Sequence, residues 1–289
     1  MVFNFLDLIC NVIKALIKGE YDLFIMKKPN IIIGFLSVFL ITLCSCSNEN
    51  VDQAKVQLLK KIVEMSIDGS SNTTLLSYDG NKIVNIDRVD KFSEFYYTDD
   101  LITKIVTLDK TNHHINTLQY LYLNGQLSKI TSSDNYVINY VHNSDGSVSY
   151  EKLTKDFQNN DVKINHGKLY FQSGNLIKDD SFLDDAGQGI LAENISSFEY
   201  DYKNNALSNV LGYNKLLDYS ITISLNNVIS SSEISSVKHI DEEQVISSIK
   251  INKSKHQYDS IGYPIEIVSE NLIFGGNDSK HLKSLLFYN

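Results

Sequence analysis

Residues 118–132, LQYLYLNGQLSKITS, contain in one short stretch the pattern that decides the fold of this chain. Two runs rich in aromatic and aliphatic residues flank the pair Asn124-Gly125. Aromatic and β-branched residues favour strands. Asn-Gly suits a tight type I′ turn, because both residues tolerate a positive φ angle. The stretch therefore predicts a β-hairpin.

The two predicted strands of this hairpin are partly amphipathic. In residues 120–123, YLYL, the aromatic side chains fall on one face and the aliphatic ones on the other, because successive side chains of a strand alternate. In residues 127–130, LSKI, the Leu and the Lys share one face, and the Ser and the Ile share the other. This pattern fits an antiparallel sheet with one face better covered than the other.

The same unit recurs along the chain: an aromatic-bearing strand, a short turn and a strand of the type L-x-K-I. Units of this kind bury their apolar surface against their neighbours, so several are needed for stability. They occupy residues 76–86, 94–108, 118–132, 138–153 and 167–180 and, at wider spacing, 198–217 and 256–270. The predicted turns of the first five are Asp79-Gly80-Asn81, Asp99-Asp100, Asn124-Gly125, Asp145-Gly146 and Ser173-Gly174-Asn175.

The segments outside the repeats are less regular. Residues 58–65 fit either a helical turn or a strand, and a strand is favoured because the repeat series begins directly after them. Residues 179–196 are acidic and contain Gly, which predicts a long loop. Residues 281–289, HLKSLLFYN, predict a final strand at the edge of the sheet.

The N-terminal region carries a different signal, in residues 26–46, MKKPNIIIGFLSVFLITLCSC. A short cationic start is followed by an apolar run over residues 31–43, which is too short to cross a bilayer core that needs about 20 residues. Leu43-Cys44-Ser45-Cys46 then resembles the lipobox of bacterial lipoproteins. In that family the Cys sulfur takes a diacylglyceryl group, the peptide is cut before it, and the new amine is acylated. The resemblance implies that Cys46 is the lipidation site.

This reading divides the chain into four parts. Residues 26–45 are the predicted signal peptide, 46–56 a polar tether, and 57–289 the repeat-built β domain. Residues 1–25 are predicted to be a misassigned N-terminal extension, and the alternative is a genuine short apolar helix. One acyl chain binds a membrane only marginally, whereas several on one residue would anchor the protein firmly. Ser47 in place of Asp favours the outer membrane, on its periplasmic face or at the cell surface.

The repeats resemble those of a known group of proteins. YDGNKIV (78–84), DLITKI (100–105) and FEYDYKNN (198–205) with LGYNKL (211–216) are similar to segments of uncharacterised Bacteroidetes lipoproteins, of flavobacterial type, with YD (RHS-like) β-hairpin repeats. The resemblance implies a β-rich envelope protein, with one or more helical turns within 207–217. It carries over no catalytic residue. The expected fold is therefore all-β: an antiparallel β-meander of repeated hairpins that forms an extended sheet, with one or two short helices in the C-terminal half.

Composition excludes several classes of function. The net charge of −9 disfavours binding to nucleic acid phosphates. Of the three cysteines, Cys10, Cys44 and Cys46, only the last would survive processing, so we expect no disulfide, thiol catalysis or cysteine metal site. The sequence has no P-loop, Rossmann glycine pattern or G-x-S-x-G elbow. We therefore predict no catalytic, cofactor-binding or metal-binding residues.

Three groups of residues could form ligand sites, but for each of them the sequence favours a structural role. Asp179, Asp180, Asp184 and Asp185 offer oxygens for Ca²⁺, but their spacing is not that of an EF-hand, and a solvated acidic loop is favoured. His113-His114 would point to opposite faces of a strand. The 17 tyrosines suit glycan stacking, but their regular place in the repeats favours packing within the sheet.

The functional expectation is a lipid-anchored outer-membrane protein that acts as a non-catalytic binding or structural module. The alternatives are a glycan-binding accessory lipoprotein and an envelope hydrolase. The expected partners are the membrane, through the lipid on Cys46, and a glycan or another envelope protein, but no nucleic acid. A cleft with two facing carboxylates would favour the hydrolase, and a flat exposed row of tyrosines would favour the glycan binder.

Overall fold

The computed structural model describes residues 56–184, 189–241, 243–273 and 280–289, all of which belong to one compact unit, Val56–Asn289. The predicted signal peptide (26–45), the predicted lipidation site Cys46 and the predicted extension (1–25) lie outside the described residues. This unit contains sixteen strands. They are β1 (Leu59–Met65), β2 (Ser71–Asp79), β3 (Lys82–Asp87), β4 (Lys91–Thr98), β5 (Leu101–Asp109), β6 (Ile115–Leu123), β7 (Gln126–Ser132), β8 (Tyr136–His142), β9 (Val148–Lys155), β10 (Asp161–Gln172), β11 (Asn175–Leu183), β12 (Ile190–Asn204), β13 (Asn226–His239), β14 (Val245–Tyr258), β15 (Pro264–Ile273) and β16 (Lys280–Tyr288).

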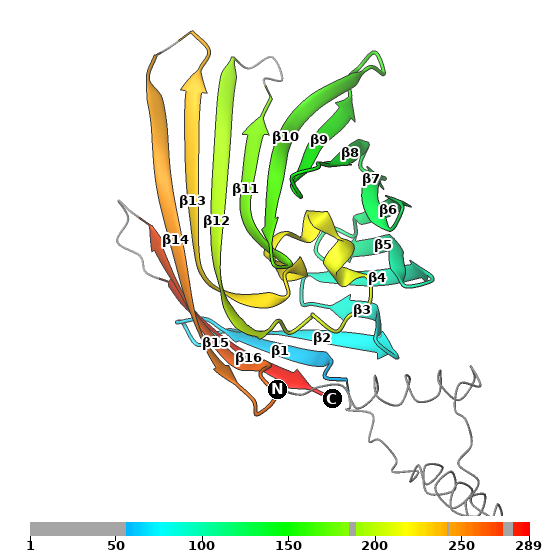
Figure 1. Cartoon of the computed structure of the whole chain (residues 1–289), viewed down its shortest axis with the longest axis vertical. Coiled ribbons are helices and arrows are strands. Elements are labelled where there is room, and N and C mark those ends of the chain that lie inside the picture. Colours follow the sequence, from blue (N-terminus) through cyan, green and yellow to red (C-terminus); the bar gives the residue numbers. More distant parts are fainter. Residues whose placement is uncertain (1–55, 185–188, 242, 274–279) are drawn as a thin grey trace, which may run out of the picture. The chain divides into compact units, whose positions relative to one another are not determined.

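The strands form a closed antiparallel barrel (Figure 1). Each strand pairs with the next along the chain, and β16 pairs with β1, from Leu59 opposite Tyr288 to Met65 opposite Lys283. The all-β meander is confirmed, but the extended sheet is wrong. An open sheet leaves two strand edges unpaired, and the twist of its strands helps to bring those edges together. The hairpin repeats specify neighbouring pairs only, so no local pattern reveals the pairing of the first strand with the last.

The turns are those that the sequence predicts. Positive φ angles occur at Gly80, Asp99, Asn124-Gly125, Gly146 and Ser173-Gly174. The strict alternation predicted for residues 127–130 is wrong, however. A register shift at Leu121/Tyr122 inserts a bulge, so that Leu127 and Ile130 are both buried, at 1% and 0% exposure.

A recurring contact explains the place of four tyrosines in the barrel. The tyrosine hydroxyl crosses to a strand of the preceding hairpin and donates to a main-chain carbonyl of a fully buried residue. These bonds run from Tyr78 to Leu59 (2.8 Å), from Tyr122 to Ile102 (2.8 Å), from Tyr200 to Leu176 (2.5 Å) and from Tyr288 to Pro264 (2.8 Å). The prediction that tyrosines pack within the sheet is therefore confirmed for this set. A phenol satisfies a buried carbonyl and fills the interior at the same time.

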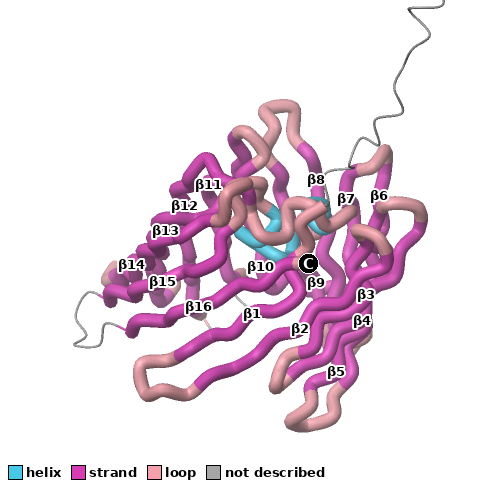
Figure 2. Tube along the Cα trace, turned by 90° about the horizontal axis from the view of Figure 1, so that it is seen from below, coloured by secondary structure: helices cyan, strands magenta, loops and turns pink. Residues whose placement is uncertain are grey.

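The segment between β12 and β13, residues 205–225, lies inside the barrel, and we call it the plug (Figure 2). It contains two 3₁₀ helices, η1 (Tyr213–Lys215) and η2 (Leu217–Ile223), and buries Val210, Tyr213, Leu216 and Ile223 in the core. The helical turn predicted within 207–217 is thus confirmed, although the helical segment continues to Ile223. Neither helix of the described residues has the length or the apolar character to cross a bilayer.

Two other expectations need correction. The long loop predicted at 179–196 is wrong, because β11 continues to Leu183 and β12 begins at Ile190. Asp179 and Asp180 are neighbours within β11, so their side chains point to opposite faces of the strand. The unit 198–217 forms no hairpin, since β12 ends at Asn204 and the chain enters the plug. The strand within 58–65 and the final strand are confirmed as β1 and β16.

Candidate functional site

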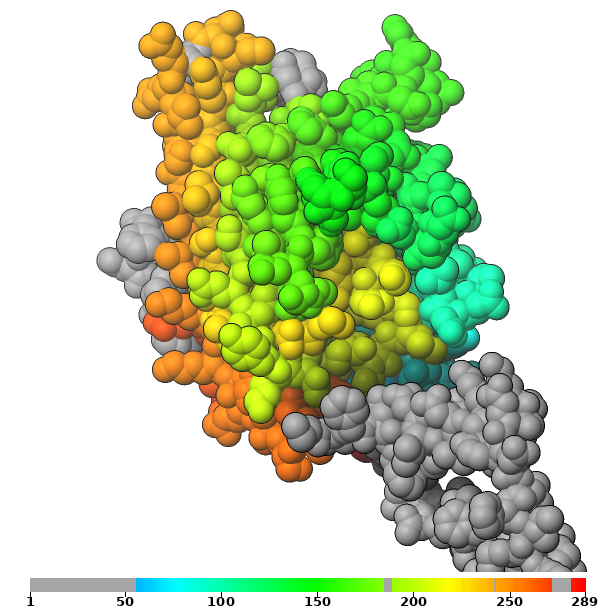
Figure 3. Space-filling model, in the orientation of Figure 1, coloured from blue at the N-terminus to red at the C-terminus, as the bar shows by residue number. Residues whose placement is uncertain are grey.

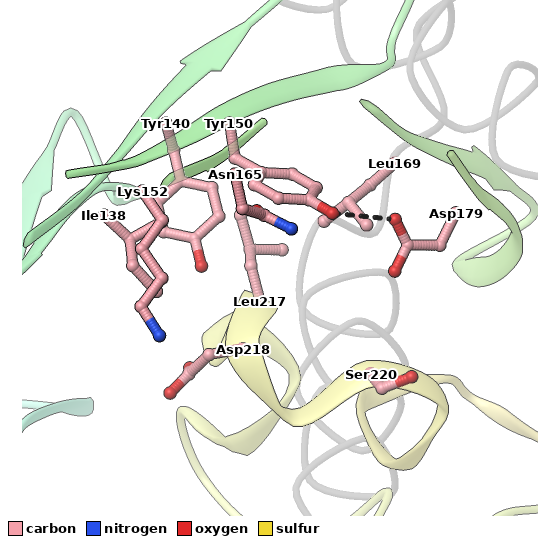
Figure 4. A pocket seen from close by; sticks show the side chains of 10 residues that line it. All are labelled: Ile138, Tyr140, Tyr150, Lys152, Asn165, Leu169, Asp179, Leu217, Asp218 and Ser220. Carbon is pink, nitrogen blue, oxygen red and sulfur yellow. Dashed lines mark hydrogen bonds between the residues drawn. The ribbon is translucent and has the colours of Figure 1, made fainter. Parts of the chain in front are cut away.

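The plug does not fill the barrel, and two chambers lie against it. The tyrosine chamber, about 200 Å³, lies between the plug and β8–β11 (Figure 4). Its lining residues are Ile138, Tyr140, Tyr150, Lys152, Asn165, Leu169, Asp179, Leu217, Asp218 and Ser220. The serine chamber, about 560 Å³, lies between the plug and β13–β16 with β1. On the face drawn in Figure 3, part of the plug is visible in yellow between the green and the cyan strands.

Asp218 is the carboxylate that the plug presents to the tyrosine chamber. It lies in η2 and is held by the hydroxyl of Tyr120 on β6, which donates to Asp218 Oδ2 over 2.9 Å. Protein surrounds this carboxyl and reduces its hydration, which raises its pKa to about 6, although the bond from Tyr120 acts in the opposite direction. A carboxyl with a pKa near neutrality inside a cavity is a candidate for a functional group.

Two donors on the facing strands point into the same chamber. Tyr140 of β8 is only 8% exposed, and its hydroxyl has no hydrogen-bond partner among the described residues. Lys152 of β9 places its Nζ 3.9 Å from the centroid of the Tyr136 ring, and no described carboxylate lies within ion-pair distance of it. Figure 4 shows both polar ends on the side of the plug. A hydroxyl without a protein partner that lines a cavity can bond a ligand, so this chamber suits a polar occupant.

A second tyrosine depends on a glycine for its position. Tyr150 of β9 lies directly opposite Gly167 of β10, and its hydroxyl donates to Asp179 Oδ1 over 3.2 Å. A Cβ at Gly167 would come within 2.4 Å of that hydroxyl. Burial raises the pKa of Asp179 as well. Gly167 therefore allows the phenol to cross its strand and reach the carboxylate.

The plug backbone is strained where it lines the chamber. Ser220 has φ 54° and ψ −133°, a conformation that residues other than glycine rarely adopt. The strain falls within the helix that presents Asp218. Gly212 brings the plug close to the wall, since a Cβ there would lie 2.6 Å from the carbonyl oxygen of Asp100. Close packing on one side thus fixes the plug while its other side faces the chamber.

The size and the chemistry of the tyrosine chamber together limit its occupant. An engineered protein cavity of about 150 Å³ holds one benzene ring, so about 200 Å³ suits one six-membered ring. The wall offers hydroxyl and ammonium donors together with carboxylate acceptors, beside the rings of Tyr140 and Tyr150. This arrangement fits a small molecule that carries several hydroxyl groups.

The structure separates the acidic residues singled out in the sequence. Asp179 lines the chamber, Asp180 pairs with Lys178 over 2.8 Å, and Asp184 pairs with His166 over 2.9 Å. Asp185 lies outside the described residues. His113-His114 lies in the turn before β6, where His114 pairs with Asp134 over 2.8 Å. No group of three metal-ligating side chains comes together in the described part of the chain.

Sequence reasoning missed Asp218, Tyr140 and Lys152, which meet across the plug. The one local signal was the single acid within GYNKLLDYS (212–220), where it lies between Leu217 and Tyr219. Exposed tyrosines do not form a row: Tyr96, 41% exposed, and Tyr202, 99% exposed, belong to β4 and β12, which are far apart in the barrel.

The chain has a weak structural similarity to a protein of known structure. No family model and no curated protein matches this sequence. A porin-like protein from Bacteroides uniformis ATCC 8492, known from a crystal structure, is similar to 80% of this chain over 96% of its own, with a TM-score of 0.40 and 10% identity. The class defined by this chain's own strand pairing is a sixteen-stranded closed barrel with an internal plug and two chambers.

Proposed function

We propose that this protein is a lipid-anchored, non-catalytic binding protein of the outer membrane, and that its tyrosine chamber holds a single hydroxyl-rich ring, such as one sugar unit of an envelope glycan. The observation that carries the proposal is the convergence of Tyr140, Lys152 and Asp218 on a space of ring size. Sugar hydroxyls both donate and accept, so they would satisfy the carboxylate and the unpaired phenol together.

The outer face of the barrel carries both polar and apolar side chains. Barrels that cross membranes carry an apolar band outside. Here Lys104, Gln119 and Thr131 lie side by side on the outer face of β5–β7. Ser230 and Ser232 lie on the outer face of β13. On the same face, however, Ile195, Ile234 and Ile249 form an aliphatic row across β12–β14, so the outer wall is mixed and the proposed attachment depends on lipid on Cys46 and on the tether 46–56.

The ligand proposal is tested by calorimetry with a panel of monosaccharides. We expect 1:1 binding of at least one neutral sugar and a loss of at least tenfold in affinity for Tyr140→Phe and Asp218→Asn. Tyr202→Phe, which changes an exposed tyrosine, is the matched control and should bind as the wild type does. Equal affinities for all four proteins would overturn the assignment of this chamber.

The anchor is tested independently by labelling cells with palmitate. The wild type should incorporate the label and Cys46→Ala should not. Retention of label in the variant, or a wild-type product that keeps residues 26–45, would overturn the lipoprotein assignment without affecting the ligand site.

A second candidate function, an envelope glycoside hydrolase, is favoured by one observation. Asp179 and Asp218 line the same chamber and both have raised pKa values, because each is partly removed from water. Glycosidases use such a pair as acid and as base or nucleophile. If the wild type releases sugar from an envelope glycan and both Asp179→Asn and Asp218→Asn abolish the release, the protein is an enzyme. Binding without turnover supports the non-catalytic proposal.

A further inference from the structure

The serine chamber is a separate space with a different chemistry. Its volume of about 560 Å³ is several times that of the engineered cavity of about 150 Å³ that holds benzene. The space is open to solvent rather than sealed, so a molecule of suitable shape can enter it. It would accept an elongated molecule rather than a single ring.

One side of this chamber is apolar. The plug contributes Leu207 and Ile221, and the barrel wall contributes Ile62, Ile267 and Leu286. These side chains belong to elements that are distant in sequence, but they share one chamber. Filling this side with an alkyl chain would remove apolar surface from water, at about 25 cal/mol for each Å².

Polar side chains lie among these apolar ones on β13–β16, and two pairs of them are hydrogen-bonded to each other. Ser254 and Ser269 are hydrogen-bonded over 2.9 Å, and Asn252 donates to Ser231 over 3.2 Å. These pairs need no partner from a ligand. Because these side chains are already hydrogen-bonded, an alkyl chain can lie against them without leaving them unpaired.

Several polar side chains of this lining have no hydrogen-bond partner among the described residues, among them Asn271, Ser284 and His256. His256 Nδ1 is buried and has no hydrogen-bond partner in the described ranges. Ser284 lies on the same cross-strand row, since His256 is opposite Ile267 and Ile267 is opposite Ser284, and no described residue bonds its hydroxyl. Together they offer a local site for a hydroxyl or an ester group.

The charges around this chamber indicate which head groups it excludes. Glu64 is the one carboxylate among its described lining residues, and no Lys or Arg is present among them. An anionic head group would meet Glu64 without any cation to balance its charge. Burial lowers the pKa of His256, which keeps this ring neutral at pH 7.

We propose that the serine chamber binds a single-chain amphiphile with an uncharged, hydroxyl-bearing head group. Its alkyl chain packs against Leu207, Ile221 and Leu286, and its head group reaches His256 and Ser284. The site is independent of the tyrosine chamber and does not rest on the function proposed for that chamber.

The test uses the chain from Ser47 onward, which retains the whole compact unit Val56–Asn289 with its closed sheet and its core. 1-Monolauroylglycerol, below its critical micelle concentration, is titrated into the protein by calorimetry. We expect 1:1 binding, and at least tenfold weaker binding of laurate, which has the same chain length and an anionic head. Absence of binding, or equal affinity for laurate, would overturn the proposal.

A matched pair of variants places the binding inside the barrel. Ser231 lines the chamber, whereas Ser232, its neighbour on β13, faces outward because side chains alternate along a strand. Ser231→Phe fills the space and should weaken binding of 1-monolauroylglycerol at least tenfold, while Ser232→Phe should change it less than twofold. Equal effects of the two variants would assign the binding to the outer surface. Asp218→Asn should leave it unchanged, which separates this site from the tyrosine chamber.

Discussion

The inner face of the barrel differs between β5–β8 and β13–β15. In the first region the inward side chains are aliphatic or aromatic, as with Ile105 (1% exposed), Tyr120 (5%) and Ile130 (0%), and they pack against the plug. In the second region they are Ser and Asn, which bond across the strands and leave space in front of them. One half of the barrel thus supplies the core, and the other half supplies the larger chamber.

The difference shows that the hairpin repeats and the closure of the barrel depend on different features of the sequence. Repeats in the first half need an apolar residue and a tyrosine at fixed places, because the tyrosine hydroxyl satisfies a buried carbonyl of the neighbouring unit. Two strands of the second half keep the tyrosine contact, from Tyr200 to Leu176 and from Tyr288 to Pro264, and β16 also closes the ladder at β1. The side chains of β13–β15 donate none of these four bonds, and the inner faces of these strands carry polar side chains that line the serine chamber.

The largest expected effect comes from truncating the packed half. Ile105→Ala should lower the free energy of unfolding by about 2–5 kcal/mol, because it leaves a cavity in close-packed surroundings. Ile246→Ala, on the inner face of β14 where the side chain is 69% exposed, should change it by no more than about 0.5 kcal/mol. Urea denaturation measures both. Similar losses for the two variants would show that the chamber half is packed as tightly as the other.

A smaller loss of stability is expected at Gly167, where the structure has no space for a side chain. Gly167→Ala should cost about 1–3 kcal/mol, because its Cβ would lie 2.3 Å from the carbonyl oxygen of Asp180 and 2.4 Å from the hydroxyl of Tyr150. Replacing Tyr150 with Leu in the same chain should recover part of this cost by removing the second contact. If the double variant is no more stable than Gly167→Ala alone, the phenol is not what excludes a side chain at this position.

The sequence predicted the hairpins and turns well, because each depends on neighbouring residues such as Asn124-Gly125. It could not predict the closed barrel, since the pairing of Leu59 with Tyr288 joins the two ends of the domain. The candidate site was missed for the same reason: Tyr140 and Asp218 are brought together only by the plug. The bulge that buries both Leu127 and Ile130 also escaped, because strict alternation assigns them to opposite faces.

The tyrosine contacts between hairpins are worth less per residue than the packed aliphatic core. Tyr122→Phe keeps the ring but leaves the carbonyl of Ile102 without its donor, which should lower the free energy of unfolding by about 1.5 kcal/mol. Tyr202→Phe, at a fully exposed position, should have an effect below about 0.5 kcal/mol. Guanidinium denaturation of the two variants makes the comparison. Equal values would mean that the hydroxyl contacts do not couple the repeats.

The smallest effect concerns Asp218 and depends on pH. The pKa of its carboxyl is about 6 in the folded protein and 3.8 in the unfolded chain, so the folded state binds the proton more tightly. The contribution of this group to stability is therefore greatest below pH 4 and declines as the pH rises through 6. Asp218→Asn removes the penalty, and it should be more stable than the wild type by about 1 kcal/mol at pH 7 and equal to it at pH 4. One pKa unit corresponds to about 1.4 kcal/mol, which sets the scale of this difference.

The exposed Asp145 provides a control of opposite sign for this measurement. Hydrogen bonds from the side chain and backbone of Ser147 lower the pKa of its carboxyl to about 2. Its contribution is therefore present above pH 4 and lost as the pH falls through 2. Asp145→Asn should be less stable than the wild type at pH 7, with a difference that shrinks on acidification. Thermal unfolding between pH 2 and pH 8 distinguishes the two. If Asp218→Asn follows the same direction as Asp145→Asn, the plug carboxylate is stabilised by its surroundings and not held ready for a ligand.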